Sequence, residues 1–188
     1  MRQATPDRWA DLVQAFGRRG EDPSWCWCQR FLNANTKTPG SAPDNRGALH
    51  REIAAASVPP GLLAYVDGHP AGWTRIVPRS ILPAVMGNRA LAKLLVDDPC
   101  AWWVSCFAVG QGYRRHGVGS ALLGAAVDFA REHGATSVEG HPVDVEKLSA
   151  KRTSGSALFT GTRAMFTAAG FIEVGRTFPT RPVMRRLL

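Results

Sequence analysis

Four stretches of the sequence predict helices, and in the first, third and fourth of them apolar residues recur at the three- and four-residue spacing of one helix face. The first, residues 5–16, begins with Thr5 as a cap and proline at the next position, and the second covers residues 46–57. The third, residues 120–133, has one apolar stripe. The fourth is shorter, starting near Thr160 or Thr162 and ending at Gly170. The first, third and fourth stretches predict one-sided helices, which must pack on another layer of structure.

Short apolar segments between and after these stretches predict strands. They cover residues 61–66, 71–77, 101–109, 136–140, 171–176 and 183–187. The first two are joined by Asp67-Gly68-His69-Pro70, a sequence typical of hairpin turns. Residues 78–99 predict an irregular or partly helical crossing, and residues 141–156 a polar loop. This order of elements predicts an α+β fold with a mixed central sheet, and we expect residues 1–188 to form a single domain.

Composition and the lengths of the apolar stretches predict the cellular compartment of the protein. The first nine residues are too polar for a secretory signal, and the longest apolar stretch, near residues 100–109, is far shorter than the ~20 residues that span a bilayer. We therefore expect a cytoplasmic protein with no membrane partner. In such a compartment the four cysteines are expected to be free thiols. Cys26 and Cys28 lack a second pair at metal-site spacing, so no metal is expected.

The formal charge is +8, from 23 basic and 15 acidic side chains, which raises nucleic acid as a partner. The arginines are scattered or paired and form no long basic run with interleaved aromatic residues. We therefore expect no nucleic-acid partner. Basic side chains around the binding loop would instead suit a polyanionic coenzyme.

The segment Arg114-Arg115-His116-Gly117-Val118-Gly119 lies between a predicted strand and a predicted helix. Backbone N–H groups at a helix N-terminus have no internal partners and sit at the positive end of the helix dipole, so the segment suits a pyrophosphate. A Walker loop would need Lys and then Ser or Thr at positions 118 and 119. A dinucleotide fingerprint would need a third glycine at position 115. Both patterns are absent, so another kind of phosphate loop is predicted.

The remaining pattern is Arg or Gln, two residues, Gly, one residue, and Gly or Ala, and it resembles the acetyl-CoA loop of the GNAT acyltransferase superfamily. Phe107-Ala108-Val109 before the loop and Leu122-Leu123 after it are similar to that family's central motif. Residues 165–171 are similar to its late helix, which ends in a Gly-Phe pair. The two matches cover roughly residues 101–176. The resemblance implies a GNAT-like mixed central β-sheet, splayed at the central strands and flanked by helices.

The resemblance also implies acetyl-CoA as cosubstrate. Backbone groups around Phe107 and Val109 are expected to hold the acetyl carbonyl and the pantetheine arm, and amides of residues 114–120 the pyrophosphate. The expected coenzyme-binding residues are Phe107, Val109, Arg114, Arg115, His116, Gly117, Val118, Gly119 and Ser120.

Acetyl transfer to an amine needs a neutral amine, a donor for the developing oxyanion and a proton for the leaving thiolate. Phe166 stands where the family often has a tyrosine that protonates the thiolate, and Phe159 where it usually has an asparagine. Ser105 or water is therefore expected to supply the proton. The family's usual positions for a general base correspond to Trp103 and Ser105, and neither side chain is a base.

Glu139 and His141 alternate onto one side of the next strand, with Asp144 beyond them, and we expect one of these groups to act as base through water. The alternative is that Glu139 is an ion-paired or solvated strand residue and that His141 belongs to a turn.

Residues 17–45 are expected to help build the acceptor pocket. Trp25, Trp27 and Trp103 are its expected aromatic walls, although core packing of the first two is the alternative. Glu21 and Asp22 are expected to attract a cationic amine.

These expectations favour acetyl-CoA-dependent N-acetylation of a small primary amine, with an aminoglycoside-type antibiotic as the most specific candidate. The net positive charge favours a zwitterionic amino-sugar or an amino acid over a strongly polycationic substrate. Acetylation of a protein lysine or N-terminus and noncatalytic acyl-CoA sensing are the alternatives, and a homodimer is left open.

Overall fold

The structure, a computed structural model, describes residues 1–22, 25–33, 41–148 and 158–188. The strands are β1 (Arg2–Gln3), β2 (Gly61–Val66), β3 (His69–Pro78), β4 (Ala101–Val109), β5 (Ser137–Gly140), β6 (Ile172–Phe178) and β7 (Arg181–Leu187). The α-helices are α1 (Trp9–Phe16), α2 (Ala42–Ala55), α3 (Pro83–Met86), α4 (Arg89–Ala92), α5 (Val118–Glu132) and α6 (Arg163–Ala168). Short 3-10 turns are η1 (Pro6–Arg8), η2 (Gly17–Glu21), η3 (Arg79–Ile81), η4 (Gln111–Tyr113) and η5 (Val145–Lys147).

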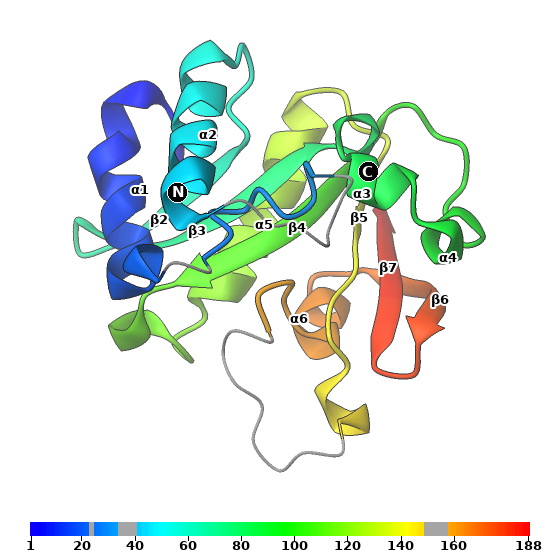
Figure 1. Cartoon of the computed structure of the whole chain (residues 1–188). Helices are drawn as coiled ribbons and strands as arrows, with labels where there is room; N and C mark the ends of the chain where they lie inside the picture. The colour runs from blue at the N-terminus through cyan, green and yellow to red at the C-terminus, as the bar shows by residue number, and fades with distance from the viewer. Residues whose placement is uncertain (23–24, 34–40, 149–157) are drawn as a thin grey trace.

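The strands form one 7-stranded sheet in the order β1-β2-β3-β4-β5-β7-β6 (Figure 1). Among the strands of the described residues, only β4 and β5 pair in parallel, and their pairing is short, from Ala101 opposite Ser137 to Val104 opposite Gly140. Strand β4 then continues to Val109 without β5 beside it. The sheet therefore opens between its two central strands, which confirms the predicted α+β fold with a splayed mixed sheet.

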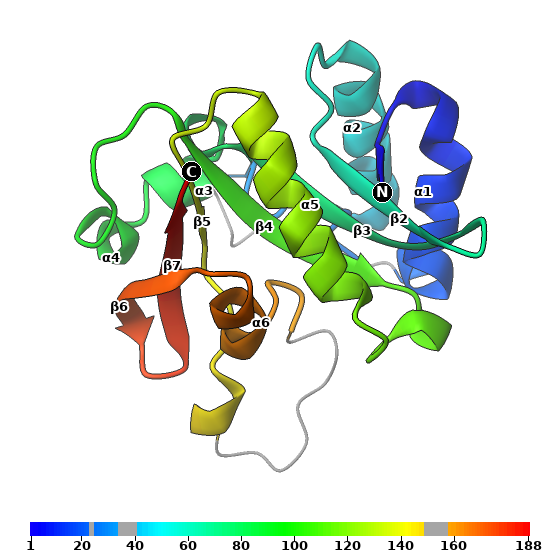
Figure 2. The ribbon, with the colours of Figure 1, turned by 180° about the vertical axis from the view of Figure 1, so that it is seen from behind.

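Helices cover both faces of the sheet. On one face α5 and α6 pack on an apolar cluster that includes Leu122, Val127 and Phe166; the long helix α5 crosses this face in Figure 2. On the other face α1 and α2 cover β2 and β3 around Trp73, and residues 79–99 cover the far end around Trp103. Both faces of β4 are thus buried, as its uninterrupted apolar sequence requires.

The helix starts follow from local residues. Helix α2 begins at Ala42, earlier than predicted, because the Ser41 hydroxyl accepts a hydrogen bond from the Asp44 N–H and proline follows near the first position. At the start of α6 the Thr162 hydroxyl accepts from the Met165 N–H, so Thr162 and not Thr160 is the cap. No helix in the described parts of the chain is long and apolar enough to cross a membrane.

A disulfide joins Cys28 to Cys106, across 78 residues of sequence and with 6.2 Å between the two Cα atoms. The expectation of four free thiols is therefore wrong for this pair, while Cys26 and Cys100 are free. The fold places the turn containing Cys28 against the middle of β4, and the spacing of the cysteines along the sequence does not predict this contact.

Candidate functional site

A cavity of about 690 Å³ is lined by residues from the end of α1, strand β4, the start of α5 and the start of α6. We call it the main cavity, and its volume is typical of a small-molecule site. Its lining residues are Gln14, Ala15, Phe16, Gly17, Arg18, Trp25, Phe107, Ala108, Val109, Gly110, Gln111, Tyr113, Arg114, Arg115, Gly117, Val118, Gly119, Ser120, Leu158, Phe159, Gly161, Thr162 and Met165. The cavity opens beside β4 where β5 has left it, so the splay of the sheet makes room for it.

The glycine loop forms one end of the main cavity. Gly117 has φ +78° and is the N-cap of α5, so its left-handed backbone turns the chain into the helix. A β-carbon added at Gly117 would meet no atom within 4 Å, which leaves the space above the helix start open. The first-turn N–H groups of α5 have no partners within the helix and point toward this space. Three arginines, Arg18, Arg114 and Arg115, line the same cavity.

Eight of the nine expected coenzyme-binding residues line the main cavity: Phe107, Val109, Arg114, Arg115, Gly117, Val118, Gly119 and Ser120. His116 does not line it and is exposed. The loop carries His116 past the cavity because Arg115 and Gly117 on either side both have positive φ, 64° and 78°.

The backbone N–H of Phe107 has a partner already. It donates to the carbonyl oxygen of Phe159 at 2.6 Å. Phe159, from the segment before α6, therefore takes up the space that β5 leaves beside β4. An acetyl carbonyl that used the Phe107 N–H would have to share or replace this hydrogen bond.

Ser105 lies at an irregularity of β4. The pairing of β4 with β3 shifts register between Arg75 opposite Cys106 and Ile76 opposite Val104, so Ser105 is the extra residue of a bulge. Its side chain is buried, and among the described atoms its Oγ has no hydrogen-bond partner. A buried hydroxyl without a partner is costly, and it is found here two residues from the cavity-lining Phe107.

Glu139 does not reach the main cavity. Its side chain is fully buried, and both carboxylate oxygens face arginines: Oε2 accepts from Arg79 Nη1 at 2.6 Å and Oε1 from Arg185 Nε at 2.7 Å. Arg185 is its cross-strand neighbour on β7. The expectation of Glu139 as general base is corrected here, because its charge is committed to a buried ion-pair network and it lines no cavity in the described structure. Glu139 is therefore an ion-paired strand residue, which was the alternative prediction.

His141 and Asp144 also lie outside the main cavity. Burial and the nearby charge of Arg181 lower the pKa of His141 to about 4, and its Nε2 lies 2.7 Å from Thr177 Oγ1. The imidazole is therefore neutral at pH 7. Asp144 accepts from Arg176 Nη1 at 2.8 Å, and although burial opposes ionisation, this hydrogen bond and the charge of Arg176 lower the pKa of Asp144. No Asp, Glu or His is among the described residues that line the main cavity.

The three tryptophans expected at the acceptor pocket lie in different parts of the structure. Trp25 lines the main cavity, and its indole N–H is buried without a partner among the described atoms. Trp27 is 1% exposed and packs in the core against Phe16, with 4.5 Å between ring centres. Trp103 is 1% exposed in the cluster beneath residues 79–99. The expectation of an aromatic wall is therefore corrected for Trp27 and Trp103, which are core residues.

The expected acidic pair lies away from the main cavity. Glu21 lines a separate, smaller cleft of about 420 Å³ with Trp9, Arg46 and His50. Asp22 is exposed, and its carbonyl oxygen accepts the Trp25 N–H at 2.9 Å. The structure therefore does not bring these carboxylates to the aromatic end of the main cavity.

Some cavity residues come from distant segments and were not assigned to the site from sequence. Gln14 and Phe16 from α1, Arg18 from η2 and Met165 from α6 line the cavity beside β4. Phe16 carried only a core signal, as one member of an apolar helix stripe, and no local pattern marks Gln14. Arg18 falls in residues 17–45, which were expected to help build the acceptor pocket, and Met165 falls in the segment similar to the family's late helix. Phe159 was noted only as a replacement, whereas its ring and carbonyl both contribute to the site.

The sequence matches the model of the acetyltransferase (GNAT) family over residues 22–150. Among solved structures, a ribosomal-protein-alanine N-acetyltransferase from Brucella melitensis is similar at 18% identity, with 100% of this chain and 98% of that chain covered and a TM-score of 0.55. The GNAT domain of PAT from S. lividans is similar at 16% identity, with 100% and 89% covered and a TM-score of 0.57. Ard1 from Thermoplasma volcanium is similar at 16% identity, with 100% and 95% covered and a TM-score of 0.52. At these identities the likeness shows the fold alone. No curated protein sequence matches this chain.

Proposed function

Because the chain belongs to the GNAT acetyltransferase family and is an N-acetyltransferase, we propose that it transfers the acetyl group of acetyl-CoA to a primary amine of a small molecule. The amine nitrogen bonds to the acetyl carbonyl carbon, the carbon–sulfur bond breaks, and the thiolate that leaves takes up a proton. The observation that carries the proposal is the single cavity that extends from the glycine loop to Trp25 and Phe159. It offers one continuous space for an anionic coenzyme and a second reactant.

The glycine-loop end of the cavity suits the pyrophosphate of coenzyme A. The first-turn N–H groups of α5 and the positive end of its dipole favour an anion, and Arg18, Arg114 and Arg115 add positive charge. Gly119 lies on the cavity wall in the first turn, where the absence of a side chain lets a phosphate approach the backbone. These features support acetyl-CoA as the donor.

Ser105 is the proposed proton donor for the leaving thiolate. Its Oγ is buried, has no other partner among the described atoms and lies close along β4 to the cavity-lining Phe107. The buried, unpartnered indole N–H of Trp25, also on the cavity wall, is the proposed donor to an acceptor or acetyl oxygen. Each group would gain on ligand binding the hydrogen bond that it lacks.

The amine loses its proton to water in this proposal. The described cavity wall holds no Asp, Glu or His that could take the proton directly. His141, neutral at pH 7, would act only through intervening water. A reaction without a protein base at the cavity should speed up with pH as the amine itself deprotonates.

The acceptor end of the cavity is mainly aromatic, with Phe16, Trp25 and Phe159. Aromatic walls with few polar groups suit a compact organic amine. An aminoglycoside-type amino-sugar stays a candidate for such a pocket, but the carboxylates expected to attract its cationic groups, Glu21 and Asp22, do not line the cavity. We therefore extend the candidate acceptors to amino acids and other small amines.

The test is incubation of the purified protein with acetyl-CoA and a panel of amino-sugar antibiotics, amino acids, polyamines and peptides. Thiol release and product mass identify any acetylated amine. Acetylation of a small amine supports the proposal. Exclusive acetylation of peptides would replace it with a protein acetyltransferase, and tight coenzyme binding without turnover of any amine would replace it with an acyl-CoA sensor.

Two glycines of α5 offer a matched test of the coenzyme end. Gly119 lines the cavity, and Gly124 on the same helix does not. We expect Gly119→Leu to weaken acetyl-CoA binding at least about tenfold, because the side chain blocks the approach of the phosphates. Gly124→Leu should leave affinity unchanged, since a β-carbon there would meet no atom within 4 Å. Calorimetry with acetyl-CoA measures both, and equal affinities would contradict the assigned phosphate site.

A further inference from the structure

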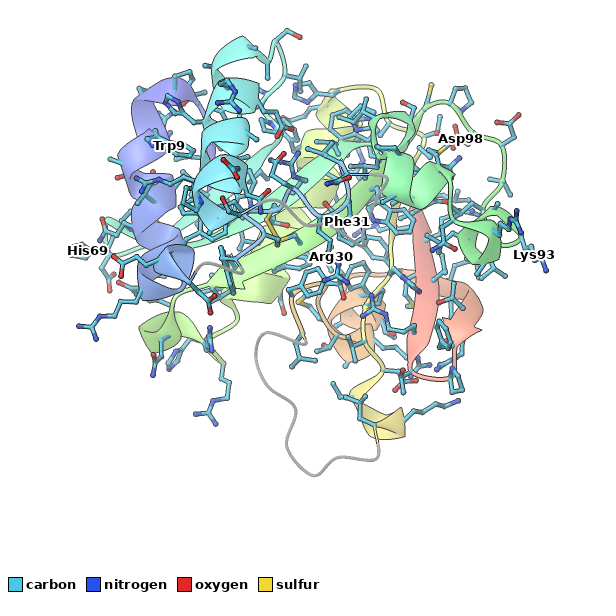
Figure 3. The ribbon with its side chains drawn as sticks, in the orientation of Figure 1. Trp9, Arg30, Phe31, His69, Lys93 and Asp98 are labelled. Atoms are coloured by element: carbon cyan, nitrogen blue, oxygen red, sulfur yellow. A yellow bond between two sulfur atoms is a disulfide. The ribbon has the colours of Figure 1, made fainter. Side chains whose placement is uncertain are left out.

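Two arginines from distant parts of the chain meet at Phe159 and Thr160. The guanidinium carbon of Arg30 lies 5.7 Å from the centre of the Phe159 ring. Arg181, the first residue of β7, donates from Nη1 to Thr160 Oγ1 at 3.1 Å. Figure 3 shows Arg30 and its neighbour Phe31 near the centre of the view. Both guanidinium groups thus contact the short segment before α6.

Neither arginine forms an ion pair with any acidic residue. Every Asp and Glu of the chain lies in the described residues, and none is within ion-pair distance of Arg30 or Arg181 there. Three other arginines, whose side chains have little exposed surface, differ in this respect. Arg75 pairs with Glu52, and Arg79 and Arg185 share Glu139. The charge at Phe159 is therefore uncompensated by the protein.

The surroundings make the positive charge of Arg181 costly. Burial and the charge of Arg30 both lower the pKa of Arg181, so this half-buried guanidinium is repelled by the exposed side chain of Arg30. His141 is also near, and because its pKa is lowered to about 4 it is neutral and offers no opposite charge. Two neighbouring guanidinium groups without an ion pair among the described residues, one of them half-buried, are an arrangement that an anion would stabilise.

This arginine pair lies next to the acceptor end of the main cavity and not at its coenzyme end. Phe159, on which Arg30 rests, lines the cavity and accepts the N–H of Phe107. The pyrophosphate end has its own arginines in the cavity wall, whereas Arg30 and Arg181 do not line the cavity. Phe159 therefore contacts both the main cavity and Arg30.

We propose that Arg30 and Arg181 form a subsite for the carboxylate of the acceptor, so that the enzyme acetylates a small amine that carries a carboxylate at the other end. The inference rests on the proposed acetyl transfer at the main cavity. Guanidinium groups are rigid forks of donors that match the two oxygens of a carboxylate. The fixed positive charge would also repel a polycationic amine, which favours an amino acid over an aminoglycoside.

The test compares amino acids with their uncharged amides, which keep the amine and the chain and lose the negative charge. We would measure thiol release for glycine, 4-aminobutyrate and 6-aminohexanoate, each against its amide, since these acids differ in the length between amine and carboxylate. At least one acid should have a kcat/KM about tenfold or more above that of its amide, as expected for hydrogen bonds to a charged group. Equal rates for every acid and its amide would overturn the proposal.

Substitutions then assign the preference to the two arginines. Arg30→Gln and Arg181→Gln should each reduce the acid-to-amide ratio about tenfold, whereas Arg89→Gln, at an exposed arginine of α4, should leave it unchanged. Arg30→Lys should restore part of the preference. A ratio that is unchanged in both glutamine variants would overturn the proposal, as would equal losses for acid and amide. Unfolding curves of each variant identify any loss that comes from misfolding.

Failure of acetyl transfer itself gives a different result. If acetyl-CoA binds but no amine is turned over, the proposed function fails, and the subsite is tested by binding alone. Calorimetric titration with the same three acids in the presence of coenzyme A should then show binding that both glutamine variants lose. No binding of any acid to the unsubstituted protein would overturn the subsite as well.

Discussion

Replacing Glu139 by glutamine separates a structural role of this residue from a catalytic one. Among the described residues, Glu139 is the only carboxylate within ion-pair distance of Arg79 and Arg185. Its side chain is fully buried, while those of the arginines are 5% and 12% exposed. Glu139→Gln keeps the size of the side chain and removes its charge. Arg79 and Arg185 then lose the anion that they share.

The expected loss of stability follows from this burial. Removing one partner of a buried ion pair costs about 3–5 kcal/mol, because the remaining charge is left uncompensated in a poorly solvated place. Arg79 also donates to the carbonyl oxygens of Val96 at 2.8 Å and Asp98 at 3.2 Å, so residues 79–99 lose part of their attachment to the sheet. For a chain of this length each 1 kcal/mol lowers Tm by about 2–4 °C, which gives a decrease of roughly 6–20 °C.

Urea unfolding and thermal melts measure the stability, and thiol release at a temperature where the variant stays folded measures kcat. We expect the free energy of unfolding to fall and kcat to stay within about threefold of the unsubstituted value. Loss of a general base would instead lower kcat by about 10²–10⁴-fold. Asp128→Asn is the control, because its ion pair with Arg131 is exposed and should contribute at most about 1 kcal/mol. Unchanged stability with a hundredfold loss of kcat would refute the structural role.

Three further predictions concern single groups. Ser105→Ala should lower kcat about a hundredfold without loss of stability, because a buried hydroxyl without a partner among the described atoms stabilises little; an unchanged kcat excludes it as proton donor. The folded-state pKa of His141 is about 4 against 6.5 in the unfolded chain, so the unfolded state binds more protons between these values and stability falls on acidification. The decrease from pH 7 to pH 5 should be about 2 kcal/mol in urea unfolding and should vanish in His141→Asn. Alkylation of the native protein followed by mass spectrometry should leave Cys28 and Cys106 unmodified until a reductant is added, and prior labelling of either would contradict the disulfide.

The helices, strands and glycine loop could be predicted from the sequence because local physics decides them. Strand β4 has the predicted bounds, and the hairpin of β2 and β3 turns at Asp67 and Gly68, both with positive φ. The start of α5 follows from Gly117, whose left-handed conformation is one that glycine adopts without strain. Periodicity, caps and glycine positions act within a few residues, so they can be read along the chain.

Strand β4 contains a bulge that local sequence patterns do not predict. Regular alternation would place Trp103, Ser105 and Phe107 on one face of the sheet. The bulge at Ser105 shifts the alternation, so that Trp103 shares a face with Cys106 while Phe107 turns to the α5 side. Trp103 is therefore a core residue. The sequence has no signal for this bulge, since its position depends on how β3 and β4 pair.

The sequence by itself determined the order of elements, the phosphate loop before α5 and the family, because each depends on residues that are neighbours along the chain. Only the tertiary structure decided which side chains share the cavity and which charges find partners. Glu139 is enclosed by arginines from residue 79 and residue 185, whereas Arg30 and Arg181 meet beside Phe159 without an acid in ion-pair distance. Such contacts join segments far apart in sequence, and their energies depend on burial, which exists only once the chain has folded.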